Sequence, residues 1–243
     1  MPEALAVCAP GENSGQCLAT MHLHGEQAMR ISFLHTIESN RQVFERAAKD
    51  LGLPTDKFHH EVRADLRESV EQAGRLTDDL KVRVHGCLLK LAAHSDAVVL
   101  TCATLGPAVA DLGDSPAPVL RADTALASAA TKAGGSITVL CAAESAIESN
   151  RRLFTDHASK SNASVTVVHL PHVWTHFKNG DHDACHAAIA SSAQEAYEGG
   201  ATVVAFAHPW MAPAANLVDK ARRPLDSPHV VLDFVMRLRY ERS

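Results

Sequence analysis

Short apolar runs alternate with amphipathic stretches along most of this chain, which predicts strands followed by helices. In the first half the predicted strands are residues 30–34, 57–62 and 96–102, and the predicted helices are 40–52, closed by Gly52, and 80–95. In the second half the predicted strands are residues 135–141, 164–170 and 201–207, and helices are predicted over 146–158, over 182–200 and from 212 onward. Apolar strands that alternate with helices indicate parallel sheets covered by helices on both faces.

The two halves resemble each other at a fixed distance along the chain. An offset of 106 residues (137 − 31) places the strand segment ISFL on ITVL, and it also places Cys102 on His208. The tetrapeptide IESN occurs at 37–40 and at 147–150, an offset of 110, so its second copy lies one helical turn further into its helix. We therefore expect only the first copy to contribute to a site.

This repeat predicts two similar α/β domains with a site in the gap between their strand ends, where parallel sheets bind ligands. The first domain is expected over 29–122, completed by 220–243, and the second over 123–219. Residues 1–28 show neither helical nor strand periodicity, and we interpret them as a mobile leader.

Composition and charge exclude several classes of protein. The net charge of -5 argues against nucleic-acid binding, which requires a basic surface. No apolar segment approaches the roughly 18–20 residues that span a bilayer, and the first 28 residues lack the pattern of a signal peptide. The six cysteines are scattered without a CxxC pair, as in reduced thiols. We expect a cytoplasmic protein that binds neither nucleic acid nor membrane.

Cys102 and His208 carry the candidate chemistry. Cys102, in VVLTCATLGPA, ends a buried strand and precedes a predicted helix, whose N–H groups and dipole favour a thiolate. Gly106 is interpreted as the residue that lets the backbone turn tightly there. His208 follows VVAFA at the matching place in the second half. Two proton-transfer groups on opposite walls of a cleft suit removal of a carbon-bound proton on one face and delivery on the other.

Such chemistry next to a carboxylate needs fixed hydrogen-bond donors for the enolate, and loops at helix N-termini provide them. The candidate carboxylate-binding residues are Thr36, Ser39, Asn40, Ala103, Thr104 and Ser145. Helix capping is the competing interpretation for the side-chain donors. Ser145 and Glu148, for example, have the spacing of a capping box.

In five sequence motifs the chain resembles the aspartate/glutamate racemase superfamily, which includes hydantoin racemases, maleate isomerases and arylmalonate decarboxylases. The motifs are FLHTIESN, TCATLGPA, PVLRADTAL, FKNGD and HPWMAPAANL, within residues 29–219, and TCATLGPA is the most specific. The resemblance implies two α/β domains related by a pseudo-twofold axis, with the substrate carboxylate in the cleft between them. It also implies cofactor-independent catalysis with a cysteine on each side of the substrate, and it is compatible with a homodimer.

This chain departs from the family at the second cysteine. Cys102 matches the first family cysteine, whereas His208 stands in place of the second and is followed by Pro209 and Trp210. Pro209 has no N–H to offer an oxyanion, and Trp210 can occupy space that a substrate group would fill. An imidazole can still transfer a proton. The leading hypothesis is therefore a racemase- or isomerase-like enzyme acting on a small carboxylate or amino acid, with Cys102 and His208 on opposite faces.

Three other interpretations stay open. A decarboxylase or lyase of the same fold would use Cys102 alone and protonate one face. A Cys–His hydrolase would use the same pair as nucleophile and base. A non-catalytic carboxylate- or metal-binding protein would use the histidines of segment 169–186, which form two i, i+4 pairs, His172 with His176 and His182 with His186. No glutamate completes a hydrolytic zinc motif there, and we expect no metal.

Overall fold

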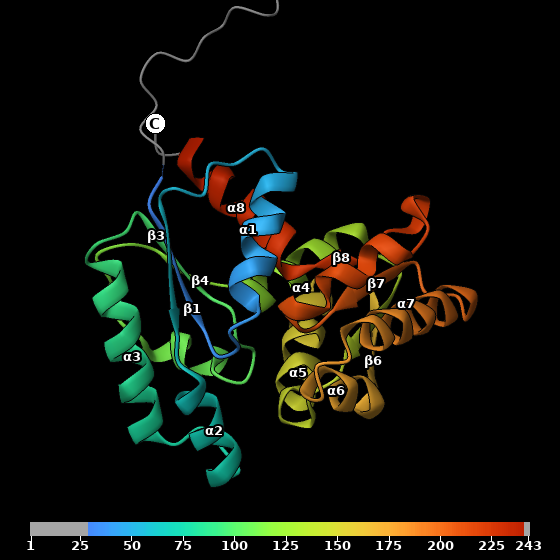
Figure 1. Cartoon of the computed structure of the whole chain (residues 1–243), viewed down its shortest axis with the longest axis horizontal. Coiled ribbons are helices and arrows are strands. Elements are labelled where there is room, and N and C mark those ends of the chain that lie inside the picture. The colour runs from blue at the N-terminus through green and yellow to red at the C-terminus, as the bar shows by residue number, and fades with distance from the viewer. Residues whose placement is uncertain (1–28, 241–243) are drawn as a thin grey trace, which may run out of the picture.

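The computed structural model describes residues 29–240 and contains two four-stranded parallel sheets (Figure 1). The first sheet has the order β2-β1-β3-β4 and consists of β1 (Ile31–His35), β2 (Phe58–Val62), β3 (Ala97–Leu100) and β4 (Val119–Arg121). The second has the order β6-β5-β7-β8 and consists of β5 (Ser136–Cys141), β6 (Ser164–His169), β7 (Val203–Phe206) and β8 (Leu225–Asp226). Two α/β units with parallel sheets, as predicted, are confirmed; the expected leader, 1–28, lies outside the described residues.

The registers of the two sheets confirm the internal repeat. Leu34 of β1 pairs with Leu100 of β3, and Leu140 of β5 pairs with Phe206 of β7. Both partners therefore shift by 106 residues (140 − 34 and 206 − 100) between the two halves. Residues that follow these strands consequently occupy equivalent places at the carboxyl edges of the two sheets.

Helices cover both faces of the first sheet because successive strand residues point to opposite sides. On one face Leu34 and Leu100 pack with α2 (Ala64–Ala73), α3 (Asp78–Ala92) and the 3-10 helix η1 (Gly106–Asp111). On the other face Phe33 packs with α1 (Asn40–Asp50) and α8 (Ser227–Tyr240). The last helix, α8, lies beside α1 and α4 in Figure 1 and shares the core of the first sheet. The assignment of 220–243 to the first domain stays a prediction.

The second sheet is covered in the same way. Val139 and Ala205 pack with α4 (Ala122–Ala133) and α5 (Ile147–Ala158), which follows the short 3-10 helix η2 (Glu144–Ala146). Leu140 and Phe206 face α6 (Pro171–Lys178), α7 (His182–Glu198) and the 3-10 helix η3 (Pro209–Leu217). A further 3-10 turn, η4, spans Lys220–Arg222.

The helix predicted from residue 212 onward is wrong in type and position. The structure has the 3-10 helix η3 there, which begins at Pro209 and contains Pro213. A proline inside an α-helix lacks the N–H for the backbone bond and clashes with the preceding turn, so the segment cannot continue as an α-helix. The pattern does not predict β4, β8, α2, α4, α6 or α8.

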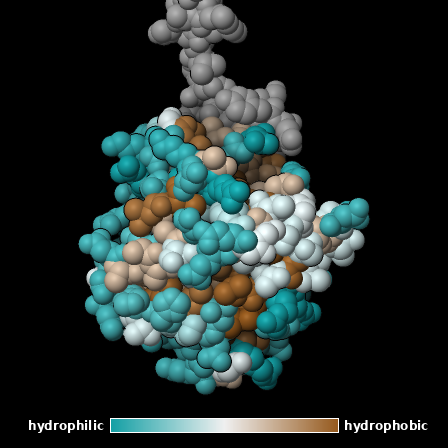
Figure 2. All heavy atoms as spheres, turned by 90° about the vertical axis from the view of Figure 1, so that its right-hand side faces the viewer, coloured by the Kyte–Doolittle hydropathy of each residue, from teal (hydrophilic) through white to brown (hydrophobic). Residues whose placement is uncertain are grey.

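None of the helices within 29–240 combines the length and the apolar character that crossing a membrane requires. Figure 2 shows a face on which hydrophobic areas are separated by hydrophilic side chains. The large exposed hydrophobic residues of the described chain are Leu51, Val82, Leu217 and Phe234.

Candidate active site

The candidate active site is a small cavity at the carboxyl ends of the strands of both sheets. Its walls come from the loops that follow β1, β3, β5 and β7, and from α2, α6 and the beginning of η3. The cavity volume is about 30 Å³, which is the room that one water molecule takes in the liquid. In this closed form the cavity is too small for an organic acid, so substrate binding requires these elements to move apart.

The structure brings seven of the eight predicted site residues to the wall of this cavity: Thr36, Asn40, Cys102, Ala103, Thr104, Ser145 and His208. Ser39 does not line the cavity. It precedes α1 without capping it, and its buried hydroxyl has no partner among the described residues. The chemical roles of all eight residues stay predictions.

The Cys102 thiol is buried among hydrogen-bond donors. Burial raises its pKa, whereas hydrogen bonds from the Thr36 hydroxyl, from the backbone N–H groups of Leu105 and Thr104 and from the Thr104 hydroxyl act in the opposite direction. The net pKa lies above the ordinary value, so the thiol is protonated at neutral pH in the closed cavity. The donors from Thr104 and Leu105 belong to the Cys102 loop itself, because the following helix, η1, is a short 3-10 helix that begins only at Gly106, and Thr36 belongs to the loop after β1.

Gly106 is required for a reason other than the predicted tight turn. Its φ is not in the positive region, but a Cβ at this position would lie 2.7 Å from Cζ of Arg121. Arg121 is held there by two hydrogen bonds to the buried Asp123, at 3.0 and 2.6 Å. The glycine therefore makes room for a fixed guanidinium beside the Cys102 loop.

Thr104 and Ser145 approach each other from the two halves of the molecule. Their hydroxyl oxygens are 3.5 Å apart, so the loop after β3 and the loop after β5 meet at the cavity. The capping box predicted for Ser145 and Glu148 is wrong. The residue that precedes α5 is Ala146, and no side chain caps this helix.

His208 is a hydrogen-bond acceptor for the loop after β5. Its Nε2 accepts from the backbone N–H groups of Ala142 (3.0 Å) and Ala143 (3.1 Å), and Cys141 Sγ lies 3.6 Å away. Burial lowers the pKa of this imidazole to about 4, so the ring is neutral and carries its proton on Nδ1. The base role predicted for His208 requires Nε2 to leave these N–H groups; in the present geometry the ring offers only a fixed N–H donor.

Aromatic rings form the wall behind His208. Trp210 stacks on His208 with a centroid distance of 5.4 Å and on Phe177 of α6 at 4.1 Å. Trp174, also from α6, lies 5.9 Å from Trp210. Trp210 is only 2% exposed, which confirms that it occupies space at the cavity.

Arg67 of α2 is a site residue that the sequence analysis missed. Its Cζ lies 5.9 Å from the ring centroid of Trp174, so it joins the two halves across the cavity. Its Nη1 donates to both carboxylate oxygens of Glu71, at 2.7 and 2.9 Å, while its buried Nε has no partner among the described residues. A signal existed: Arg67 lies five residues beyond Val62, the last residue of β2, and thus near the same carboxyl edge as Cys102.

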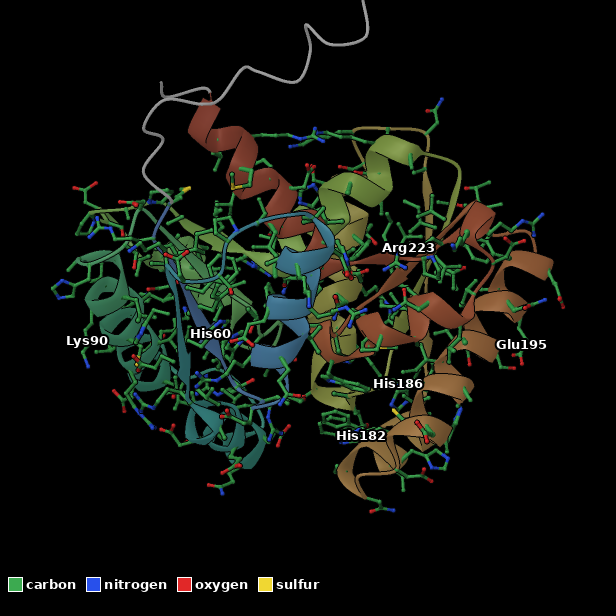
Figure 3. All side chains as sticks on the ribbon, turned by 45° about the horizontal axis from the view of Figure 1, so that its top comes forward. His60, Lys90, His182, His186, Glu195 and Arg223 are labelled. Carbon is green, nitrogen blue, oxygen red and sulfur yellow. The ribbon has the colours of Figure 1, made fainter. Side chains whose placement is uncertain are left out.

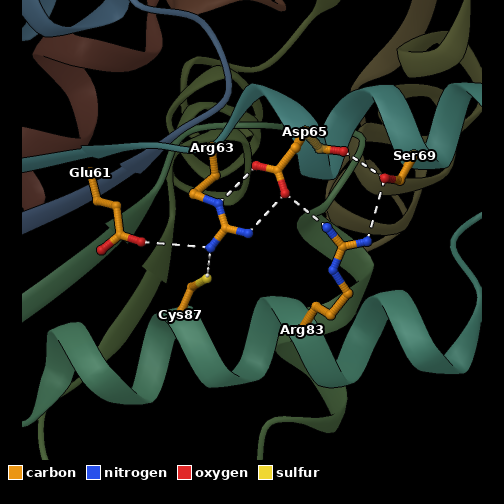
Figure 4. Close-up of polar contacts among 6 residues, drawn as sticks. All are labelled: Glu61, Arg63, Asp65, Ser69, Arg83 and Cys87. Carbon is orange, nitrogen blue, oxygen red and sulfur yellow. Dashed lines mark hydrogen bonds and ion pairs between the residues drawn. The ribbon is translucent and has the colours of Figure 1, made fainter.

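A polar network fixes the helix that carries Arg67 (Figure 4). Arg63, just before α2, donates two hydrogen bonds of 2.8 Å to Asp65 and one of 3.0 Å to Cys87 Sγ on α3. Arg83 of α3 donates to the same carboxylate at 2.8 Å and to Ser69 at 3.4 Å. Hydrogen bonding to Arg63 holds the pKa of Asp65 below its ordinary value, so the network stays charged at neutral pH.

Three residues that line the cavity each have one buried polar atom without a partner in the described chain: Asn40 Oδ1, Arg67 Nε and Trp210 Nε1. Buried polar groups are almost always hydrogen-bonded, so this group of two donors and one acceptor points to a polar ligand. A carboxylate matches the two donors.

The histidine-rich segment does not form a metal site in the described chain. His172 and His176 lie on α6, and His182 and His186 lie on α7, as Figure 3 shows for the second pair. Within residues 29–240, no group of three or more histidine, cysteine or acidic side chains is arranged to hold a metal ion.

Solved racemase structures superpose on most of this chain. A glutamate racemase from Bacillus anthracis is 15% identical, with 89% of this chain and 84% of that chain covered and a TM-score of 0.65. An aspartate racemase from Picrophilus torridus is 11% identical (83% and 90% covered, TM-score 0.63), and an allantoin racemase from Klebsiella pneumoniae is 14% identical (87% and 87%, TM-score 0.63). The chain has the fold of these racemases.

This likeness concerns the fold alone, because one fold supports many reactions and the identities are low. No protein-family model and no curated protein matches the sequence. The function must therefore be argued from the cavity.

Proposed function

We propose that this chain is a cofactor-independent enzyme of the racemase or isomerase type, which transfers a proton at the carbon next to a carboxylate of a small acid or amino acid. The observation that carries the proposal is the Cys102 thiol, buried at the cavity and surrounded by donors from Thr36, Thr104 and Leu105. A protonated thiol in such surroundings can give its proton to an enolate, and the same donors then stabilise the thiolate that remains.

The substrate carboxylate is assigned to the two unpartnered donors. Arg67 and Trp210 belong to opposite halves and both line the cavity, and their Nε and Nε1 atoms are buried without partners in the described chain. A carboxylate between them would satisfy both buried groups and would hold the closed form together. Asn40 Oδ1 would accept a hydrogen bond from a substrate N–H or O–H group.

Solvent deuterium uptake tests this proposal directly. The protein in D₂O would be mixed in turn with each enantiomer of aspartate, glutamate and allantoin, and with maleate and phenylmalonate, and followed by proton NMR. We expect deuterium at the carbon next to the carboxyl or equivalent carbonyl group of at least one compound. We also expect the Cys102→Ala variant to lose this uptake by a factor of roughly 10²–10⁴, the usual contribution of a general acid or base.

Cys185→Ala is the matched control, since Cys185 is also buried but lies on α7, away from the cavity wall. Uptake that persists unchanged in the Cys102 variant would remove this residue from the mechanism. Absence of uptake from every compound would count against proton transfer on this class of acids.

A second candidate is a one-sided reaction, in which a bond to carbon dioxide or another group breaks and Cys102 protonates one face. The observation that favours it is the pair of backbone N–H groups that occupies His208 Nε2. An imidazole held in this way has no lone pair with which to accept a proton from the second face.

The two candidates differ in the stereochemistry of exchange. A two-sided enzyme exchanges both enantiomers, whereas a one-sided enzyme exchanges one or releases CO₂. If His208 acts only as a fixed N–H donor, the His208→Gln variant should react more slowly than the native protein. Its pH–rate profile should keep any titration near neutral pH that the native profile shows. If the native protein exchanges both enantiomers, and the His208→Gln variant loses such a titration and exchanges only one of them, His208 is established as the second proton-transfer group.

A further inference from the structure

Behind Cys102, the first half contains a chain of buried hydrogen bonds that the proposed reaction does not use. His35, at the end of β1, contacts the Thr101 hydroxyl through Nδ1 at 2.9 Å and His60 Nδ1 through Nε2 at 2.9 Å. His35 is fully buried, and the His60 side chain is only 3% exposed. The rings of Phe33, His35 and His60 are nearly parallel, so stacking sets the planes of the two imidazoles.

The direction of each hydrogen bond follows from the inner end of this chain. The Thr101 hydroxyl donates its only proton to the Leu34 carbonyl at 3.1 Å, so it must accept from His35 Nδ1. Burial lowers the pKa of His35 to about 3 and that of His60 to about 4, so both rings are neutral. His35 Nε2 therefore accepts from His60 Nδ1, and His60 Nε2 carries no proton.

At the outer end of this series of hydrogen bonds, no proton lies between His60 and Glu45. His60 Nε2 is buried without a hydrogen bond among the described residues, and it faces Glu45 Oε1 of α1 at 3.9 Å. Two acceptors that face each other have no proton to share, although a proton placed there would bind to both. The Glu45 side chain is 48% exposed, so it can collect that proton from water. Figure 3 shows His60 beside α1.

The inner end of the chain reaches the cavity. Thr101 lines the cavity and immediately precedes Cys102 in the sequence. The cavity volume of about 30 Å³ has room for one water molecule, and such a water would connect the hydroxyl with the thiol. The polar chain thus runs from the exposed carboxylate of Glu45 to the site.

We propose that Glu45, His60, His35 and Thr101 form a proton relay that restores the proton of Cys102 after it has been given to the substrate. This inference rests on the proposed function. A proton from water, passed on by Glu45, binds to His60 Nε2, and the Nδ1 proton of His60 moves to His35 Nε2. The Nδ1 proton of His35 moves to Thr101 Oγ1. The Thr101 hydroxyl turns its own proton from the Leu34 carbonyl toward a water in the cavity, and this proton passes through the water to the Cys102 thiolate.

One proton enters and one leaves, so neither ring remains charged and the thiolate becomes a thiol. Both rings end in the other tautomer and must turn before the next proton can follow. Repeated turnover therefore depends on the relay, whereas the first turnover uses the proton already on Cys102 and does not need it. A one-sided reaction needs it most, because each protonation of carbon consumes a proton from solvent. Arg41 of α1 and the neighbouring His59 also act on His60, and both lower its pKa, so they oppose its full protonation.

A substrate-free measurement tests the relay by itself. In protein labelled with ¹⁵N-histidine, two-bond ¹⁵N–¹H spectra should show the Nδ1–H tautomer for both His35 and His60. After transfer to D₂O, the His35 Nδ1 proton should exchange faster than the backbone amides of β1, although the ring is fully buried. A resting Nε2–H tautomer in either ring, or exchange as slow as that of these amides, would overturn the relay.

Two variants keep the hydrogen bonds and block the transfer. In His60→Asn, the side-chain amide can donate to His35 but cannot take up a proton. In Glu45→Gln, an exposed position that folding tolerates, the amide can donate to His60 Nε2 and hold the resting tautomer. We expect both variants to slow the exchange of the His35 proton by about tenfold or more while the β1 amides stay unchanged. His59→Asn, on the exposed side of β2, is the control. Because His59 lowers the pKa of His60, its removal should not slow the exchange of the His35 proton.

Kinetics then connect the relay with catalysis. With a compound that shows deuterium uptake, His60→Asn and Glu45→Gln should keep the first turnover within about twofold of the native rate and slow steady-state turnover by about tenfold. Imidazole added to the buffer should restore part of the His60→Asn rate. Equal effects on the first and later turnovers would assign these residues a structural role. If no compound is turned over but the exchange difference persists, the proposed substrate class fails and the proton pathway stands.

Discussion

The two halves of this molecule have the same topology, yet cysteine and histidine have changed places between them. In the first half β1 ends in His35 and the loop after β3 carries Cys102. In the second half β5 ends in Cys141 and the loop after β7 carries His208. Both positions are related by the repeat of 106 residues (141 − 35 and 208 − 102).

The surroundings make these equivalent positions chemically different. Cys102 lies at the cavity among donors, whereas Cys141 is fully buried, and burial raises the pKa of its thiol to about 12. His35 continues through His60 toward solvent, whereas His208 is occupied by two backbone N–H groups. Duplication of a fold therefore does not duplicate the chemical surroundings of a residue. Under the proposed function, the first half supplies a thiol that the proposed relay recharges, and the second half supplies a fixed N–H donor.

The largest expected effect compares the two cysteines. Cys102→Ser should reduce deuterium uptake by roughly 10²–10⁴, because a hydroxyl is a much weaker acid than a thiol. Cys141→Ser at the equivalent strand end should leave uptake within a few-fold and should mainly lower the free energy of unfolding, by about 1 kcal/mol. Rates measured by NMR and urea unfolding of both variants check this contrast. Similar losses of uptake in both variants would mean that the halves are functionally symmetric.

The sequence alone predicts that Cys102 and His208 occupy equivalent places in the two halves of the molecule. Apolar runs ending in polar residues predict the strands that carry Cys102 and His208, and the offset of 106 predicts that they are equivalent. Thr36, Asn40, Thr104 and Ser145 are expected near them because loops that follow parallel strands meet at one edge, and all four line the cavity, while their roles stay predictions.

The remaining features depend on contacts between distant segments. Arg67 and Trp174 lie on short helices whose periodicity is too brief to predict, and their meeting requires both halves to be in place. The tautomer of His208 depends on the backbone N–H groups of Ala142 and Ala143, some 65 residues earlier in the chain. The reason for Gly106 is the Arg121 side chain, which no local turn rule reveals.

We expect acid to destabilise the two halves to different extents. His35 and His60 of the first half have pKa values lowered by burial to about 3 and about 4, and His208 of the second half to about 4, from an ordinary value of 6.5. Below pH 6.5 the unfolded chain binds protons that the folded chain cannot, so stability falls as the pH drops toward these values. Each pKa unit corresponds to about 1.4 kcal/mol, so every one of these imidazoles costs a few kcal/mol near pH 4.

The first half contains two such rings, so its sheet should unfold locally at a higher pH than the second. Amide exchange followed at pH 7, 5.5 and 4.5 is expected to show loss of protection in β1 and β2 before β5 and β6.

His229 acts in the opposite sense. Its hydrogen bond to Asp226 raises its pKa, so its contribution is present below pH 6.5 and is lost as the pH rises through the raised value. In His60→Asn the first half should resist acid better, and simultaneous opening of both sheets in the native protein would contradict this ranking.

The smallest effect compares Gly106 with its equivalent in the second half, Ala212. In Gly106→Ala the new Cβ would meet the Arg121 guanidinium, which Asp123 holds in place, so we expect a loss of roughly 1–2 kcal/mol in the free energy of unfolding. Where a Cβ has room, the same change usually stabilises a protein by about 0.4–1 kcal/mol, so the sign decides the matter. Urea unfolding of Gly106→Ala with Gly86→Ala as the control, a helical glycine on α3 with open space at its Cβ, measures that sign. A gain in stability at Gly106 would show that Arg121 moves aside freely, and the Cys102 loop would then be no more tightly held than its counterpart at Ala212.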